Sequence, residues 1–162
     1  MAYTLVDYYK VSEDEIVEML RSNIKDPLGI NRQTGQFVDH GIGHYEGKTP
    51  RILVKRGRPI PTKYTGIGEL TQDLKLSFLI VVEVAPSAGG EVRGVKKTGP
   101  ELLNIIVGEV ANVMQDNVHP SDNDSDTIIK QIKRTSDGGY DFNPTTNVHF
   151  TIQIYEVDIL NG

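Results

Sequence analysis

The chain has 162 residues, of which 38% are hydrophobic and 24% charged, and its length suits one folded domain, 1–162, with a core of its own. Its net charge of −5 argues against nucleic-acid binding through a broad basic surface, and the absence of cysteine excludes disulfides and thiolate metal ligands. No apolar run is as long as a membrane span and no signal-peptide pattern is present, so we expect a protein that works or assembles inside a cell.

The first predicted element is a helix over residues 12–24. Ser12 and Glu15 have the spacing of a capping box, in which each side chain bonds a backbone N–H at the start of the helix. Apolar residues recur along this segment at helical spacing: Ile16, Met19, Leu20 and Ile24. The segment before it, 1–10, is rich in aromatic and aliphatic residues, and we expect a short strand or an arm there.

Residues 28–50 form a glycine-rich extension without a sustained hydrophobic period. A loop of this length inside a compact domain is usually functional or disordered. Four of its residues are apolar or aromatic, which a simple linker does not need: Phe37, Val38, Ile42 and Tyr45. We therefore expect the extension to become ordered against a neighbouring molecule, with these four residues in the interface.

The most regular pattern in the chain covers residues 74–84. Apolar and polar residues alternate there at a spacing of two, which predicts a long strand. Leu79 and Val81 interrupt the polar side, so we expect the middle of the strand to be covered on both faces, as in the interior of a sheet. A shorter strand is predicted at 51–56, and an extended loop at 57–68.

A basic loop at 85–98 follows the long strand. Arg93, Lys96 and Lys97 make it the most compact basic feature near that strand. Two interpretations stay open: a mobile, solvated loop, or an arm that contacts an acidic partner surface or a nucleic-acid backbone.

A long helix is predicted at 99–116. Thr98 and Glu101 have the spacing of a capping box, and Pro100 falls in the first turn, where proline is favoured. The apolar stripe of this segment is broad, which indicates that it packs on a sheet.

Two strands close the chain, at 127–134 and 147–160, and we expect them to pair as a hairpin. In the last strand the apolar alternation changes parity after Ile154, which predicts a bulge or bend. The predicted fold is therefore α+β: a mostly antiparallel sheet of about four strands, two main helices packed on it, and long glycine-rich loops.

A phosphate-binding motif is suggested but incomplete. Gly94 and Gly99 have the spacing of the two P-loop glycines and lie between a strand and a helix. Pro100 and Glu101 stand where a lysine and a serine or threonine are required, and a glutamate opposes a phosphate. We therefore expect a basic loop and a capped helix rather than a nucleotide site.

Other candidate ligands fall in two loops. One is an acidic run that imitates the first positions of an EF-hand but lacks its glycine and its closing glutamate: Asp122, Asp124 and Asp126. The second loop contains side chains of the types that bind metals, but they lie among glycines rather than on a rigid helix or strand: Asp39, His40, His44 and Glu46. With no Ser–His–Asp arrangement and no carboxylate pair of defined geometry, we expect no catalytic residues, no resident metal and no cofactor.

The order of these elements resembles that of the tail terminator, or tail completion, proteins of tailed bacteriophages, which include the lambda-type terminators and related tail-to-head joining proteins. The similarity covers most of the chain from about Ser12. It lies in the segments LSFLIVVEV, PELLNIIVGEVANVM and VHFTIQIYEVDI and in the loop after the first of them.

The resemblance implies a structural virion protein of the tail or neck, assembled in the host cytoplasm. Such a protein caps the tail tube as a homo-oligomeric ring, commonly a hexamer, and receives the head connector or stopper protein. DNA would pass through the lumen without specific binding, and we expect no membrane partner. A net acidic subunit suits that passage because like charges repel.

A closed ring needs two different patches that meet between neighbouring copies. We assign these patches to the extension and to the basic loop: Phe37, Val38, Ile42, Tyr45, Arg93, Lys96 and Lys97. Three other classes stay open: another neck or head-completion protein, a small metal-dependent enzyme that uses the His40 and His44 loop, and a free-standing regulatory domain.

Overall fold

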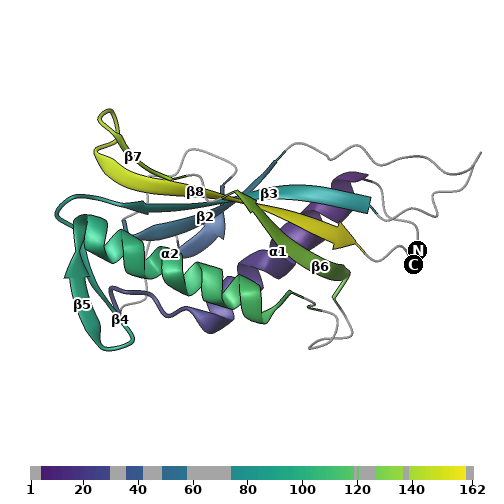
Figure 1. The fold of residues 1–162 in the computed structure, drawn as a ribbon, viewed down its shortest axis with the longest axis horizontal. Helices are drawn as coiled ribbons and strands as arrows, with labels where there is room; N and C mark the ends of the chain where they lie inside the picture. Colours follow the sequence, from purple (N-terminus) through teal and green to yellow (C-terminus); the bar gives the residue numbers. More distant parts are fainter. Residues whose placement is uncertain are drawn as a thin grey trace, which may run out of the picture.

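A computed structural model describes residues 5–29, 36–41, 49–57, 74–118, 120, 127–136 and 139–159. It has two layers, a sheet of six strands and a pair of helices that both lie on one face of that sheet (Figure 1). The elements in chain order are α1 (Leu5–Asn23), β1 (Val38–His40), β2 (Arg51–Arg56), β3 (Leu74–Val84), β4 (Gly89–Val92), β5 (Val95–Thr98), α2 (Gly99–Asp116), β6 (Ile129–Ser136), β7 (Tyr140–Asn143) and β8 (Val148–Ile159). Neither described helix is long and apolar enough to cross a membrane.

The fold class is the predicted one, because the sheet is mostly antiparallel and two helices pack on it. The sheet order is β1-β2-β3-β8-β6, with β7 also paired to β8, and β4 and β5 form a separate two-stranded sheet. The main sheet thus has six strands rather than about four. β1 and β7 span three and four residues, which is too short for an alternating pattern to be recognised.

Strand β3 lies in the interior of the sheet, as its sequence predicts. It pairs antiparallel with β2 on one side and with β8 on the other. Its side chains at even positions from Leu76 to Val84 are fully buried toward the helices. On the opposite face Val81 is 5% exposed, so the middle of the strand is covered on both sides, as expected.

The first helix begins earlier than predicted. Ser12, the expected N-cap, lies in the middle of α1 and is completely buried. The apolar face continues back to Tyr9, whose ring packs edge-on against Phe78 with 5.6 Å between centroids. Glu15, the expected capping partner, instead accepts a hydrogen bond from the Ile128 amide at 3.0 Å. The capping-box spacing was therefore coincidental.

The predicted loop at 85–98 is an ordered hairpin of β4 and β5. Its turn is Arg93–Gly94, and both residues have positive φ, 49° and 80°, as in the tight turns that suit twisted hairpins. The Val92 side chain is buried against the body, and the Gly99 amide donates to the Ala88 carbonyl at 2.9 Å. These contacts fix the base of the hairpin to the start of α2.

The bulge predicted in the last strand is absent. The pairing of β8 with β3 continues without a shift from Leu74 opposite Ile159 to Val84 opposite His149. The core-facing parity of β8 never changes, because Thr151 and Gln153 occupy core positions and are 2% exposed. The Gln153 Oε1 accepts a hydrogen bond from the Tyr155 hydroxyl at 2.6 Å, which satisfies this polar group inside the core. The irregularities in pairing lie in β6 instead.

The edge strand β1 runs parallel to β2 and is also bonded on its outer side. Phe37 O and Gly41 N pair with β2. The carbonyl of Val38 accepts from Arg21 Nε at 2.9 Å, and the amide of His40 donates to Asp39 Oδ1 at 2.8 Å. Side chains of the same chain thus occupy backbone groups that an edge strand usually presents to solvent.

Two glycines of α2 should respond oppositely to alanine. Gly99 has φ of +54°, and an added Cβ would lie 2.7 Å from the Pro86 carbonyl oxygen, so Gly99→Ala is expected to destabilise the fold by roughly 1–3 kcal/mol. Gly108 is exposed inside the helix with no atom near its added Cβ, so Gly108→Ala should stabilise it by about 0.5–1 kcal/mol. Urea denaturation of both variants measures the difference, and equal effects would contradict this account.

Candidate interaction surfaces

The three basic residues assigned to the interface lie on the β4–β5 hairpin, and each has a carboxylate of the same chain nearby. Arg93 Nε donates to Glu109 Oε2 at 2.9 Å. Lys97 Nζ lies 3.4 Å from Glu101 Oε2, and Lys96 stands opposite Glu91 in the strand register. The hairpin therefore offers a partner little net positive charge, although the three side chains remain largely exposed.

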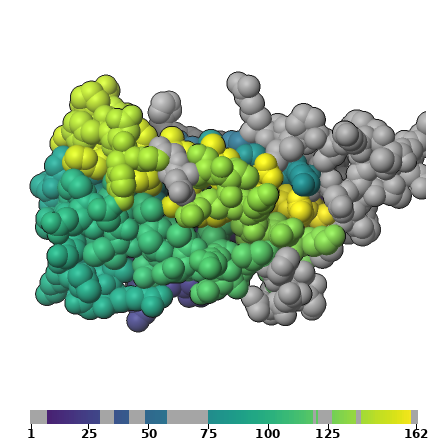
Figure 2. Space-filling view, viewed as in Figure 1, coloured from purple at the N-terminus to yellow at the C-terminus, as the bar shows by residue number. Residues whose placement is uncertain are grey.

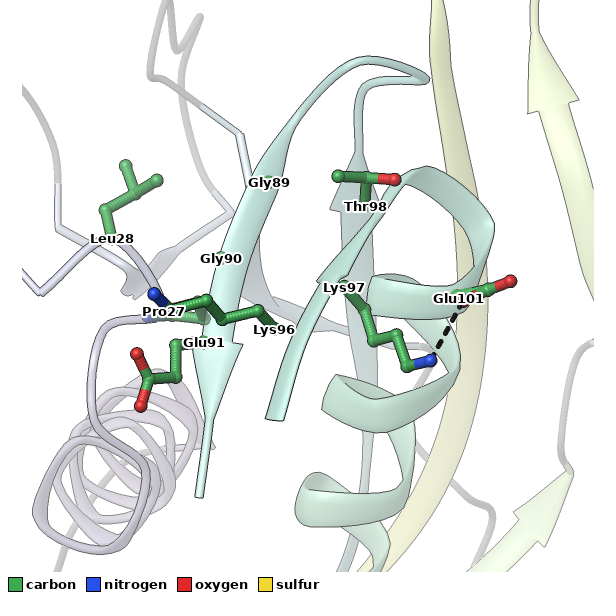
Figure 3. Close-up of a pocket in the computed structure, with 9 residues that line it drawn as sticks. All are labelled: Pro27, Leu28, Gly89, Gly90, Glu91, Lys96, Lys97, Thr98 and Glu101. Atoms are coloured by element: carbon green, nitrogen blue, oxygen red, sulfur yellow. Dashed lines mark ion pairs between the residues drawn. The ribbon is translucent and has the colours of Figure 1, made fainter. Parts of the chain in front are cut away.

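An open cleft of about 650 Å³ is lined by this hairpin, the turn after α1 and the start of α2 (Figure 3). The turn contacts the hairpin directly, because the Glu91 amide donates to the Pro27 carbonyl at 2.8 Å. The walls of the cleft are Pro27, Leu28, Gly89, Gly90, Glu91, Lys96, Lys97, Thr98 and Glu101. Its two lysines are matched by two glutamates, and Lys97 reaches toward Glu101 in the figure. Gly94 and Gly99 stand at opposite ends of β5 rather than in one phosphate-binding loop. This geometry gives an anion no concentrated positive charge.

The residues assigned to the glycine-rich extension divide into two groups. Phe37 and Val38 are 5% and 1% exposed and belong to the core of this chain, beside α1 and β2. Ile42 and Tyr45 lie outside the described residues. The part of the interface assigned to this extension therefore stays a prediction.

The candidate metal ligands Asp39 and His40 are engaged with other side chains. Asp39 Oδ1 lies 3.6 Å from Arg21 Nη2, and His40 Nδ1 lies 2.9 Å from Glu13 Oε2. Within the described ranges, no group of three or more histidine, aspartate or glutamate side chains is arranged to hold a metal ion. His44, Glu46 and the acidic run from Asp122 to Asp126 lie outside these ranges.

One face of the sheet is turned away from the two helices (Figure 1). The strand register places apolar side chains of β2, β3 and β8 on that face. Leu53 and Val81 are nearly buried there, at 4% and 5% exposure, beside a salt bridge of 2.7 Å between Arg51 and Glu83. Four further apolar residues of β3 and β8 are partly exposed on the same face: Leu79, Phe150, Ile152 and Ile154. We call these six apolar residues the helix-free face.

The sequence analysis did not indicate this face, because the change of apolar parity after Ile154 was explained by a bulge or bend. In the register, Ile152 lies opposite Val81 and Ile154 opposite Leu79, so their side chains share the face away from the helices. The available signal was that apolar residues occupy both parities of this one strand, first Phe150, Ile152 and Ile154 and then Tyr155, Val157 and Ile159. The polar residues Thr151 and Gln153 lie between these apolar positions, yet they point into the core and are 2% exposed.

A second exposed apolar feature is on β7. Tyr140 and Phe142 are 60% and 40% exposed, and Phe142 contacts the His149 ring at 4.8 Å between centroids. Figure 2 shows the β7–β8 hairpin as the yellow-green corner above α2. Such aromatic residues are frequent in protein–protein interfaces.

No protein-family model matches this chain, and no curated protein sequence matches it.

Proposed function

We propose that this protein is a tail terminator of a tailed bacteriophage. It would act without catalysis, as a structural ring, commonly of six copies, that closes the tail tube and joins it to the head connector. The ring would belong to the tail or neck of the virion and let DNA pass through its lumen.

The helix-free face is the observation that carries this proposal. Both helices bury one side of the sheet, whereas the other side keeps partly exposed apolar residues on β3 and β8. Exposed apolar surface of this kind commonly marks a contact between proteins. Its polar border, with the Arg51–Glu83 pair, resembles the rim of such contacts.

The two ordered hairpins support the same proposal. A ring requires two different patches on each copy, and a sheet face together with a projecting hairpin supplies unlike surfaces. The β4–β5 hairpin exposes Val95 at 45%, and β7 exposes Tyr140 and Phe142. The net charge of −5 would repel passing DNA and so favour its sliding.

Ring formation is tested by the mass and shape of the purified protein, alone and with tail tubes. We expect a particle of several times the 18.0 kDa chain in native mass spectrometry, and rings at tube ends in negative-stain images. Ile154→Lys places a charge on the helix-free face and is expected to yield folded monomers, because burying an unpaired charge in an interface is costly.

Asn112→Lys is the matched control, since it adds the same charge on the exposed side of α2. This variant should assemble like the unmodified chain. The proposal would be overturned if the purified protein stayed monomeric at all concentrations and did not bind tail tubes. If the Ile154→Lys variant still assembled into rings, the helix-free face would not be the contact between copies.

A further inference from the structure

A groove of about 500 Å³ lies between the last turns of α2 and the edge strand β6. Three of its lining side chains are apolar and 2–3% exposed: Met114, Ile132 and Tyr155. Gln115 of α2 and Arg134 of β6 also line the groove, and both are exposed. Buried apolar side chains bordered by exposed polar ones are typical of a site that binds another protein.

The β7–β8 hairpin, at one corner of the molecule in Figure 1, carries a projecting aromatic surface. Tyr140 and Phe142 are 60% and 40% exposed. Between them Asp141 is exposed as well, and its carboxylate accepts a hydrogen bond from the Phe142 amide at 2.8 Å. No ion pair joins Asp141 to another described residue. We call Tyr140, Asp141 and Phe142 the β7 knob.

The groove and the β7 knob lie at opposite ends of one edge of the sheet. β6 pairs with residues 154–159 of β8, and β7 pairs with residues 148–151 of the same strand. In this register Arg134, Tyr140 and Phe142 lie on the face toward the helices. Because side chains alternate along a strand, Lys133 and Asp141 lie on the other face. The two patches therefore match side by side, but they can meet only between copies.

The charges of the two patches are opposite in sign. Lys130, Lys133 and Arg134 give β6 three cations within five residues, although the whole chain has a net charge of −5. Glu156 stands opposite Lys133 in the register, yet Lys133 forms no ion pair within the described part of the chain. This basic strand beside an apolar groove fits an acidic segment that carries aromatic side chains, and the β7 knob has both properties.

We propose that the β7 knob of one copy docks on the β6 edge of the next copy. An aromatic ring of the knob enters the groove, and Asp141 pairs with Lys133 on the other side of the strand. The contact joins two different patches, so it repeats head to tail from copy to copy. This inference rests on the proposed ring and deepens it: Ile154 of the helix-free face lies opposite Ser136 of β6, so a knob on this edge lies beside that face too.

Charge reversal in the full chain, followed by analytical ultracentrifugation, tests this contact. Asp141→Lys and Lys133→Asp each bring like charges together, and we expect each to weaken association about tenfold or more. The variant with both substitutions has opposite charges again and should associate like the unmodified chain. Glu18→Lys is the matched control, because it changes the net charge as Asp141→Lys does, but on the exposed side of α1. It should not weaken association.

The contact is wrong if neither single charge reversal weakens association, if the double variant associates no better than the single ones, or if the unmodified chain stays monomeric. Normal rings of Asp141→Lys at the ends of tail tubes would reject this contact and leave the proposed function standing. If the charge reversals behave as expected but the assembled protein does not bind tail tubes, the contact stands and the proposed function fails.

Discussion

Replacing Phe78 with alanine is expected to lower the free energy of unfolding by about 3–5 kcal/mol, the largest stability loss that we predict for an apolar residue. Phe78 lies in the middle of β3 and is completely buried. Its ring contacts Tyr9 of α1, and its register partners are Arg56 and Tyr155 on the two neighbouring strands. The substitution therefore leaves a cavity where the sheet and the first helix meet.

Phe142→Ala is the matched control, because it removes the same ring from a site that is 40% exposed. It should change the free energy of unfolding by less than about 0.5–1 kcal/mol. Urea denaturation at one protein concentration measures both variants. Equal losses would show that Phe78 is not a central core residue.

Replacing Glu13 with alanine is expected to cost about 1–3 kcal/mol at neutral pH, because it removes a buried carboxylate that contacts two partly exposed side chains, His40 and Arg56. Glu13 is the side chain through which α1 contacts both His40 of β1 and Arg56 of β2. Without it the guanidinium of Arg56, whose Nε is buried, loses its carboxylate.

Glu18→Ala tests whether position rather than residue type decides the effect. Glu18 lies on the exposed side of the same helix, where its carboxylate accepts a hydrogen bond from Ser22 at 3.3 Å. Its loss should change stability by no more than about 0.5 kcal/mol in the same urea titration. A mild effect of Glu13→Ala would show that the buried carboxylate contributes little.

The elements with long, regular patterns could be predicted from the sequence. β2, β3 and α2 occupy the expected residues 51–56, 74–84 and 99–116. Each has either an unbroken apolar run or a stripe wide enough to fix its period. The broad fold class follows from the order of these elements.

The errors have a common physical origin, since local signals were outweighed by contacts distant in sequence. Ser12 looked like a helix start, but Tyr9 extends the buried face of α1 through its contact with Phe78. Thr151 and Gln153 looked solvent-facing, but the register with β3 places them in the core. The hydrophobic pattern of a single segment cannot show which distant segment will pack or pair with it.

The candidate surfaces were the least predictable part. The contacts between α1 and the first two strands join Glu13 and Asp14 to His40 and Arg56, which lie 26 to 43 positions further along the chain. The helix-free face likewise depends on which strands are neighbours. The β4–β5 hairpin could have been found, because Val92 and Val95 flank a two-residue turn that contains glycine.

Arg21 and Asp39 bond the outer backbone groups of β1, and these bonds affect how readily the protein can aggregate at high concentration. Open strand edges template cross-β stacking, in which further chains add backbone to backbone and grow into fibrils. Here the outward carbonyl of Val38 and amide of His40 are already bonded, and on β6 the amide of Ile132 donates to the Val118 carbonyl at 2.8 Å. These bonds leave fewer backbone groups on the β1 and β6 edges with which a further chain could pair.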